Sequence, residues 1–466
     1  MIKNNQIMHE KKCHTIFNDI KNGAILYVRI EDTFFLEAKK SYSDEPDNTK
    51  YMRVSILTDA IIDYDLKMFK SERGTDFLEN YRPYFISFVV SLGTNKLDDL
   101  RVIGDSWCSA KFIKGDKPIM YESVTIKGYL EMSASPISYL NGRLLVFKDK
   151  SIDASILKRI NETYNLPNFQ CRSDADINRV LNEAWKGDFP VTIDIYNIGH
   201  GNADYIRGEK YRILYDIGYN YRSMPSYHNA KYLRAVNAIR HLKPSCVILS
   251  HWDLDHIIGC AYAEKDIFTK KCIAPNLTSN LDKNASKNSI RLAAYLQKLG
   301  SLYLVDRNRR ITSQLIATIT GGNGTKIKLW LGTGRDGTIT IRNTEGLMIE
   351  IIDEKDLYSH ILLSGDVPYA CMPDLVMQKT INFMHVPHHC SKMNLAKLNN
   401  SSNQGECAII STNRNADRQL NCDIGHFNEL FRNFHDVIST MDNGCRDDEA
   451  NLSVQIKYRY KNFCFR

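Results

Sequence analysis

The sequence predicts an α/β protein of two domains, a β-rich N-terminal domain and a second domain in which strands alternate with helices. The chain has 466 residues, which is more than one hydrophobic core usually serves. Between about 24 and 148, runs rich in β-branched and aromatic residues are separated by turn clusters. After Pro190, strands alternate with helical stretches. We place the domains at 1–188 and 189–466.

The N-terminal domain is defined by short strand-like runs. In order they are ILYVRI, TFFLEA, YMRVSILT, YFISFVVSL, SVTIKGYLEM and RLLVFK. They predict a small barrel or sandwich, and a barrel of the oligonucleotide-binding kind is one alternative. A helical connection from about 154 to 183 follows. The pattern indicates no chemistry for this domain, and docking of a protein partner is one expectation for it.

The second domain begins with a strand over 191–198 that leads into a glycine turn. The segment RILYDIG is the next expected strand, and apolar residues spaced three apart predict a helix that ends near Pro244. The buried run CVILS, a helix near 289–299, a hairpin region over 320–340 and the strands LMIEIID and ILLSGD complete the pattern.

Composition excludes several classes of protein. The 12 cysteines are scattered without a CxxC pair, so we expect reduced thiols. The sequence shows neither a signal peptide nor an apolar run of the ~20 residues that a spanning helix needs, which predicts a cytoplasmic protein without membrane insertion. Residues 1–190 contain 27 basic and 27 acidic residues, and the remainder contains 34 and 27, so the net charge of +7 arises in the second part. A polyanionic ligand is compatible with this excess.

Four potential metal ligands follow the buried strand CVILS within six residues, namely His251, Asp253, Asp255 and His256. At the end of a strand such side chains can converge. Two imidazoles and two carboxylates in one place would desolvate each other at high cost unless a cation compensated them. The alternative is a polar loop in which Asp253 or Asp255 caps a helix.

Two later strands end in similar residues. ILLSGD ends in Asp366, and MHVPHHCS contains His388 and His389. Open α/β sheets place their sites at such strand ends, so the three loops are expected to meet. An isolated Gly-Asp turn or histidine pair would be weak evidence alone.

These motifs, in this order, resemble the metallo-β-lactamase superfamily. The HxDxDH pattern, LLSGD and VPHHCS are most similar to the hydrolase domain of ComEC-type competence proteins. IGHGNADYI resembles the family's Gly-Gln-Gly-Asp-Ala turn, and Cys390 stands where the family usually has Gly. The resemblance implies an αββα sandwich with a metal site at one edge.

The resemblance also implies a ligand set for two divalent ions. His251 and Asp253 would hold one ion, Asp255 and His256 the other, and Asp366 would bridge them. His388 or His389 would complete the second site, and the sequence does not decide between these two. Zn²⁺ and Mn²⁺ both suit such ligands, so the metal identity stays open.

Further residues are expected near the reaction. Two ions about 3.5 to 4 Å apart can activate water and stabilise charge on a phosphoryl oxygen, so Asp255 is a catalytic candidate as well as a ligand. His426, in a Gly-His segment that also resembles the family, is the second catalytic candidate. The candidate substrate contacts are Trp252, Asn343, Ser391 and Lys392.

The function that fits best is a binuclear metal-dependent hydrolase, a phosphodiesterase or nuclease acting on DNA or RNA. A phosphodiesterase for a cyclic nucleotide or another small phosphoester is the first alternative. The second alternative is a scaffold protein that keeps the fold without catalysis. The intact ligand motifs argue against that scaffold.

Overall fold

The computed structural model describes most of the chain. It covers residues 2–465 except 36–49, 71–80, 93–106, 116–122, 134–136, 165–168, 186–190, 209, 220–234, 236, 278–284, 308–313, 322–324, 335–340, 354–355, 399–403, 413–421, 441–452 and 458–461. The chain forms two compact units. Unit 1 comprises 1–168, 222–227 and 283–300, and unit 2 comprises the remainder. The first long segment of unit 1 ends at 168, before the domain boundary expected at 188. Segment 283–300 lies in the second part of the sequence but belongs to unit 1.

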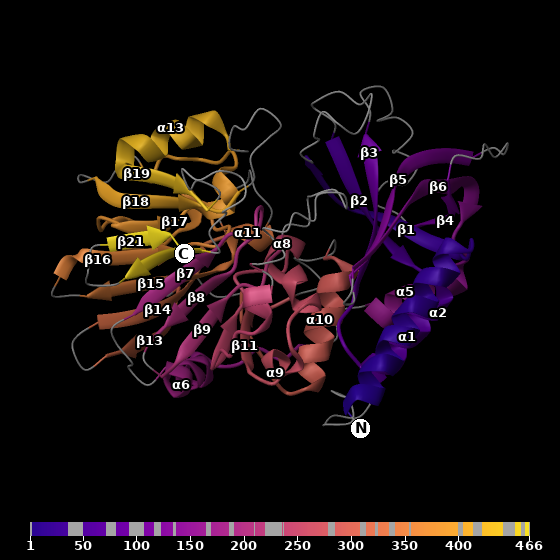
Figure 1. The fold of residues 1–466 in the computed structure, drawn as a ribbon, viewed down its shortest axis with the longest axis horizontal. Coiled ribbons are helices and arrows are strands. Elements are labelled where there is room, and N and C mark those ends of the chain that lie inside the picture. Colours follow the sequence, from indigo (N-terminus) through magenta and orange to yellow (C-terminus); the bar gives the residue numbers. More distant parts are fainter. Residues whose placement is uncertain are drawn as a thin grey trace. The chain divides into compact units, whose positions relative to one another are not determined.

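Unit 1 contains a closed barrel of six strands (Figure 1). All its strand pairs are antiparallel, in the order β1-β2-β3-β5-β6-β4. The strands are β1 (Ile25–Phe35), β2 (Lys50–Leu57), β3 (Phe85–Leu92), β4 (Cys108–Lys114), β5 (Ser123–Ser133) and β6 (Ile137–Ser151). Five coincide with runs expected from the sequence. The strand β4 was not predicted, because its first four residues, Cys-Ser-Ala-Lys, include no β-branched residue.

The described residues of unit 1 include the helices α1 (Ile2–Lys21), α2 (Asp59–Lys70), α5 (Ala154–Tyr164) and α10 (Lys287–Lys298). A buried ion pair joins two of them, since Arg291 Nε of α10 donates to Asp65 of α2 at 2.6 Å. The same carboxylate accepts hydrogen bonds from the hydroxyls of Tyr84 and Tyr164. The Arg291 guanidinium also lies over the Tyr84 ring at 4.6 Å. With these partners the buried charges are compensated.

Unit 2 contains two mixed β-sheets. The eight-stranded sheet has the order β12-β11-β10-β9-β8-β7-β20-β21. Its strands are β7 (Thr192–Tyr196), β8 (Asp204–Arg207), β9 (Arg212–Tyr215), β10 (Cys246–Ile248), β11 (Lys271–Pro275), β12 (Leu302–Val305), β20 (Ser453–Lys457) and β21 (Asn462–Phe465). The strands β9 to β12 run parallel, as their connections through helical segments require.

The seven-stranded sheet has the order β13-β14-β15-β16-β17-β18-β19. Its strands are β13 (Leu315–Thr320), β14 (Thr325–Leu331), β15 (Leu347–Asp353), β16 (Asp356–Leu363), β17 (Phe383–His385), β18 (Gly405–Ile410) and β19 (Phe434–Ser439). The strands β16 to β19 are parallel to one another. Their carboxyl ends therefore lie along one edge of the sheet.

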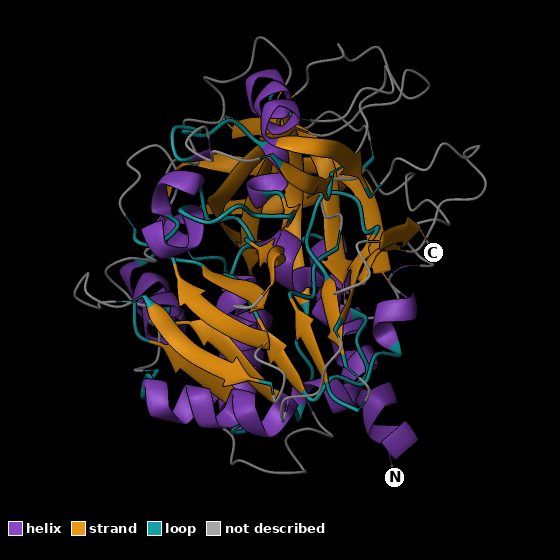
Figure 2. Ribbon diagram, turned by 90° about the vertical axis from the view of Figure 1, so that its left-hand side faces the viewer, coloured by secondary structure: helices purple, strands orange, loops and turns teal. Residues whose placement is uncertain are grey.

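One hydrophobic core lies between these two sheets. Ile193, Ile213 and Ile248 from the first sheet share it with Ile349 and Ile361 from the second. Alternate residues of the second sheet, such as Met348 and Leu362, point to its other face, where a second cluster forms with the helices there. Unit 2 is therefore an α/β structure built around two stacked sheets (Figure 2).

The described part of unit 2 includes the helices α6 (Asp174–Trp185), α8 (Leu254–Ile257), α9 (Lys265–Phe268), α11 (Ile341–Thr344), α12 (Asp374–Met377) and α13 (Ile424–Asn433). The 3-10 turns are η2 (Ile258–Ala261), η3 (Tyr369–Cys371) and η4 (Pro387–Cys390). Leu430 of α13 and Val376 of α12 belong to the cluster on the outer face of the seven-stranded sheet. Among the described residues, no helix has the length and apolarity that crossing a membrane requires.

Candidate metal centre

Four loops bring potential ligands together in unit 2. The hexad 251–256 follows β10, Asp366 follows β16, and the histidine pair 388–389 follows β17. All three are at carboxyl ends of parallel strands, as the sequence predicted. The fourth loop, which the sequence analysis did not select, joins β7 to β8 and contains His200.

Asp216, directly after β9, organises the start of the hexad. Its carboxylate accepts the Ser250 backbone N–H at 2.6 Å and the Ser250 hydroxyl at 2.7 Å. It also contacts His256 Nδ1 at 2.7 Å. Asp216 is fully buried and has a left-handed backbone, with φ of 61°. The residue therefore fixes both the loop and one imidazole.

Close backbone approach explains a glycine beside Asp216. A Cβ atom added to Gly218 would lie 2.0 Å from the Asp255 carbonyl oxygen and 2.5 Å from that of Asn202. Only glycine permits this contact. The turn that holds His200 is thereby packed directly against the hexad.

The first group of candidate ligands is His251, His256 and Asp366, all buried. His256 Nε2 lies 3.1 Å from Asp366 Oδ1, and His251 Nε2 lies 3.7 Å from Asp366 Oδ2. Asp253, whose side chain is 23% exposed, is 3.6 Å from His251 Nε2. Although Asp253 stands at the N-cap position of α8, its side chain makes no capping hydrogen bond. The capping alternative therefore fails for Asp253.

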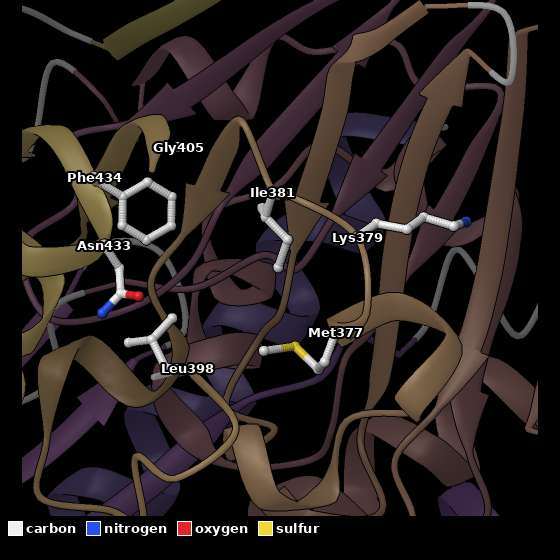
Figure 3. A pocket seen from close by; sticks show the side chains of 7 residues that line it. All are labelled: Met377, Lys379, Ile381, Leu398, Gly405, Asn433 and Phe434. Atoms are coloured by element: carbon white, nitrogen blue, oxygen red, sulfur yellow. The ribbon is translucent and has the colours of Figure 1, made fainter. Parts of the chain in front are cut away.

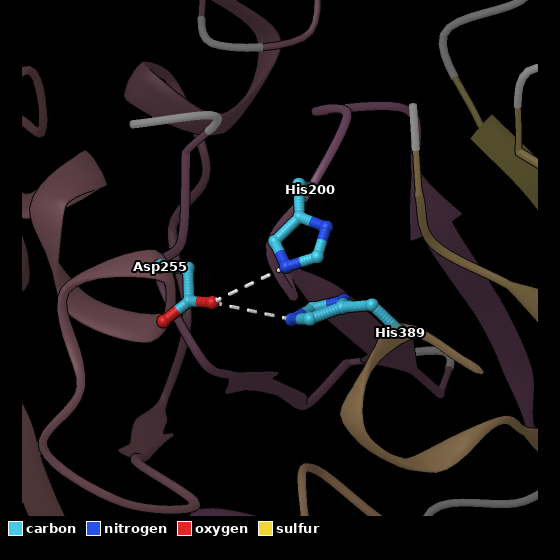
Figure 4. A group of neighbouring side chains, drawn as sticks. All are labelled: His200, Asp255 and His389. Atoms are coloured by element: carbon cyan, nitrogen blue, oxygen red, sulfur yellow. Dashed lines mark ion pairs between the residues drawn. The ribbon is translucent and has the colours of Figure 1, made fainter. Parts of the chain in front are cut away.

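The second group is His200, Asp255 and His389, also buried (Figure 4). Asp255 Oδ2 lies 3.4 Å from His389 Nε2 and 3.9 Å from His200 Nε2. The rings of His200 and His389 are 4.1 Å apart between centroids. Each group thus offers two imidazoles and one carboxylate.

Asp366 belongs to the first group and also faces the second. Its Oδ1 is 3.8 Å from His389 Nε2, and its Oδ2 is 3.8 Å from Nε2 of the half-exposed His388. Both histidines of the pair therefore face this carboxylate, and His389 also belongs to the second group. Asn343, buried on α11, donates to Asp366 Oδ2 at 3.3 Å and holds that carboxylate in place.

The hydrogen bonds fix which nitrogen of each imidazole carries a proton. His389 Nδ1 lies 2.8 Å from the Ser411 carbonyl oxygen, which only accepts, so this Nδ1 carries the proton. The Asp216 carboxylate accepts a hydrogen bond from His256 Nδ1, so this nitrogen also carries the proton. The Ser250 hydroxyl donates to Asp216 and hence accepts from His251 Nδ1 at 2.9 Å. The three Nε2 atoms face the centre.

These atoms provide a test of whether a metal ion fits. Nε2 of His251, His256 and His389 are buried and have no hydrogen-bond partner among the described residues, and the same is true of Asp366 Oδ1. Lone pairs of imidazole and carboxylate that point at each other repel unless a proton or a metal ion lies between them. The residues therefore fit divalent ions, and both groups are candidate metal sites.

The charges of the centre are strongly coupled. Burial alone lowers the pKa of His256, but Asp366 and Asp216 outweigh it and raise that pKa well above the ordinary value. Burial raises the pKa of Asp366, but the neighbouring histidines, His256 first, hold it well below the ordinary value. A positive charge, whether a proton or a metal ion, is therefore favoured beside Asp366.

The histidine pair lies on a strained turn. His388, His389 and Cys390 have φ values of 50°, 53° and 65°. The left-handed region costs roughly 1–2 kcal/mol for each residue other than glycine. Backbone hydrogen bonds from His388 N to the Gly365 carbonyl and from Asp423 N to the Cys390 carbonyl hold the turn. The strain directs both imidazoles towards Asp366.

The predicted substrate contacts lie in different surroundings. Trp252 is buried, and its indole N–H donates to the Pro275 carbonyl at 2.7 Å, so it packs within the protein. Asn343 contacts Asp366, as described above. Lys392 is exposed and Ser391 is half-buried, immediately after the strained turn. Lys392 is therefore accessible to a ligand.

His426 lies outside both groups of ligands. Its Nδ1 is 2.9 Å from the Ser391 carbonyl, and its Nε2 is 2.9 Å from the Tyr369 hydroxyl. Burial is the main cause that lowers the pKa of His426. A neutral imidazole that donates to Ser391 and accepts from Tyr369 satisfies both contacts. The geometry thus gives His426 a positioning contact with the loop after the turn.

Two features of the arrangement differ from the ligand set implied by the resemblance. His256 lies with His251 and Asp366, whereas Asp255 lies with His389. His200 adds a candidate ligand that the sequence analysis did not select. The signal available in the sequence was a histidine between two glycines, in the loop that joins two predicted strands.

One pocket lies away from these groups. It is lined by Met377, Lys379, Ile381, Leu398, Gly405, Asn433 and Phe434 (Figure 3). This lining contains no histidine, cysteine or carboxylate and shares no residue with the two groups. It is therefore separate from the candidate metal centre.

Comparison with known proteins gives distant likenesses only. No protein-family model matches the chain, and no curated protein matches it. Yeast PDE1 in its unliganded form is 11% identical over 54% of this chain and 97% of its own, with a TM-score of 0.30. A diphosphatase from the PhnP family is 10% identical over 59% and 100%, with a TM-score of 0.27. CmlA, a diiron β-hydroxylase from Streptomyces venezuelae, is 13% identical over 54% of this chain and only 45% of its own, with a TM-score of 0.25.

Proposed function

We propose that this chain is a binuclear metal-dependent hydrolase of the metallo-β-lactamase type, with an αββα sandwich in unit 2. The observation that carries the proposal is the pair of buried groups, each with two histidines and one aspartate, that meet at Asp366. Asp366 belongs to the first group, and its Oδ1 lies 3.1 Å from His256 Nε2 of that group and 3.8 Å from His389 Nε2 of the second. Two stacked sheets and helices beside them support the fold assignment. In a scaffold protein that bound no metal ion, the free energy needed to bury these charged groups would have no compensation.

The proposed reaction is hydrolysis of a phosphodiester. Two divalent ions at this centre would supply an activated water and compensate charge on a phosphoryl oxygen. Asp366 and Asp255 would hold the ions with the imidazoles, and Asn343 keeps the Asp366 carboxylate oriented. The exposed Lys392 offers a positive charge, and the partly exposed His388 offers a hydrogen-bonding imidazole, where a phosphate would enter.

A nucleic acid is the proposed substrate and partner. The basic excess of the chain lies beyond residue 190, which favours a polyanion. The likeness of HxDxDH and VPHHCS to the hydrolase domain of ComEC-type proteins favours the same substrate class. Two divalent cations, Zn²⁺ or Mn²⁺, are the proposed cofactors.

The deciding experiment measures metal content and turnover together. Purified protein is loaded with Zn²⁺ or Mn²⁺ and tested on single-stranded DNA, duplex DNA, RNA and a chromogenic bis-phosphodiester. Asp255→Asn should reduce turnover by at least ~10²-fold, because it removes a ligand oxygen from the second group. Asp374→Asn, which changes an exposed carboxylate paired with Lys397, is the matched control.

The outcomes separate the functional classes. Cleavage of a nucleic acid that Asp255→Asn abolishes supports the proposal. Turnover of the small diester alone would replace it with a small-molecule phosphodiesterase. A protein that binds no metal and cleaves nothing would contradict the hydrolase assignment.

A further inference from the structure

Two free cysteines lie beside each other at the strained turn. Cys390 is buried directly after His389, and Cys422 is partly exposed directly before Asp423, the N-cap residue of α13. Asp423 N donates to the Cys390 carbonyl at 2.8 Å, and this bond brings Cys422, the residue before Asp423, beside Cys390. Both side chains pack in the same apolar cluster. Two segments distant in sequence therefore bring two cysteines together in one apolar cluster.

The position of this pair connects it to the candidate metal centre. Cys390 ends the turn that orients His389 towards Asp255. Cys422 precedes the helix whose His426 contacts the Ser391 carbonyl at 2.9 Å. Neither thiol belongs to the groups of candidate ligands. The pair thus lies where a covalent bond would act on the ligand turn without replacing a ligand.

We propose that Cys390 and Cys422 form a reversible disulfide that weakens metal binding by the His200–Asp255–His389 group. The inference rests on the proposed function, since it assumes that this group binds a metal ion. It adds a redox-regulated modification site whose reaction partner is a small-molecule disulfide such as oxidised glutathione.

The reaction is a thiol–disulfide exchange in two steps. The more accessible Cys422 sulfur attacks oxidised glutathione, which forms a mixed disulfide and releases one reduced glutathione. The Cys390 sulfur then attacks the Cys422 sulfur of the mixed disulfide and releases the second. Two protein thiols are oxidised, one glutathione disulfide is reduced, and the two thiol protons leave on the released glutathiones.

The disulfide changes the ligand turn because of its length. An S–S bond of about 2.05 Å is much shorter than any contact between two separate thiols, so one or both segments must move to form it. Cys390 lies in a left-handed run with His388 and His389, while His389 Nδ1 is tied to the Ser411 carbonyl. Movement of Cys390 therefore strains or breaks the alignment of His389. Disturbed support of a ligand typically lowers metal affinity about 10–100-fold.

The test compares reduced and oxidised full-length protein. Protein equilibrated in glutathione buffers is analysed by intact mass and by peptide mapping, and zinc affinity is measured by competition with a chromophoric chelator. We expect a 390–422 cross-link and a loss of at least ~10-fold in the affinity for one zinc ion on oxidation. Cys422→Ser should bind zinc equally in both states. Cys390→Gly, which suits the left-handed backbone, should behave likewise.

The control is Cys171→Ser, which changes another partly exposed thiol and should keep the redox response. Absence of the 390–422 cross-link overturns the inference, and so does equal zinc affinity of reduced and cross-linked protein. Failure of the reduced protein to bind zinc contradicts the proposed metal centre and, with it, this switch. Redox-sensitive binding by the parent that both variants lose supports the switch independently of any substrate.

Discussion

The substitution Asp216→Asn tests whether one carboxylate sets the state of the metal centre. In the native protein Asp216 accepts three hydrogen bonds, two from Ser250 and one from His256 Nδ1. An asparagine keeps the shape but replaces one oxygen by an N–H donor. The amide oxygen must remain opposite the Ser250 N–H, because the reverse orientation sets donor against donor. The amide nitrogen then donates to His256 Nδ1.

This exchange moves the proton of His256 to the other side of the ring. A neutral imidazole that accepts at Nδ1 carries its hydrogen on Nε2, the atom 3.1 Å from Asp366 Oδ1. An N–H in that position excludes a cation. We expect zinc affinity to fall about 10–100-fold, which corresponds to about 1.4–2.8 kcal/mol. The size and burial of the side chain are unchanged, so the fold should persist.

The assay is competition for zinc with a chromophoric chelator, together with circular dichroism to verify the fold. Asp194→Asn is the matched control, because Asp194 is a buried aspartate of the same sheet that pairs with Arg207 instead of a candidate ligand. The control should bind zinc like the parent. A folded Asp216→Asn protein with native zinc affinity would refute the argument from the tautomer.

Three further predictions follow from other contacts. His200→Ala should remove about one of two bound zinc ions, measured as metal per chain, because the second group loses one of three ligands. Gly218→Ala should destabilise by about 3 kcal/mol in urea unfolding, since the new Cβ would overlap the Asp255 carbonyl. Glu350→Gln should cost about 3 kcal/mol at neutral pH. Burial raises the pKa of Glu350, but His360 and two lysines lower it from 4.5 to about 2. That stability is present above pH 4.5 and is lost as the pH falls through about 2, so the difference between parent and variant should disappear in acid.

Each of these has a control. His435→Ala removes an exposed histidine and should leave the metal content unchanged. Gly300→Ala adds a Cβ atom with nothing within 4 Å of it, so this variant lacks the overlap. Gly300 has φ of 70°, a left-handed backbone that Gly218 does not share, and this strain should cost only about 1 kcal/mol. Glu183→Gln changes an exposed glutamate paired with Arg179. Equal effects of a variant and its control would contradict the corresponding prediction.

The convergence of the three predicted loops was accessible from the sequence because it depends on a general rule. Runs such as CVILS and ILLSGD were recognisable as apolar strands, and open α/β sheets place their sites at the ends of such strands. The density of ligand-type residues in 251–256 then located the centre. Which histidine faces which carboxylate depends on differences in distance of less than an ångström. The spacing of residues in the sequence does not determine such differences.

Other features depend on contacts between distant segments. His200 gains its role only because Gly218 allows its turn to approach Asp255. Trp252 resembles a substrate contact in sequence, but the Pro275 carbonyl satisfies its indole and the ring stays buried. The closed barrel requires β1 to pair with β4, and a gap of this length between partners leaves no local pattern.

The assignment of α10 to unit 1 has a practical consequence for expressing unit 2 as a separate fragment. A fragment that starts at 169 would still encode α10, yet would lack Asp65 and the tyrosines that surround Arg291. The Arg291 guanidinium and the apolar side chains of Ile290 and Leu292 would then be exposed without their native neighbours. Exposed apolar side chains of this kind promote aggregation. A fragment designed to express unit 2 alone should therefore replace segment 283–300 with a short polar linker.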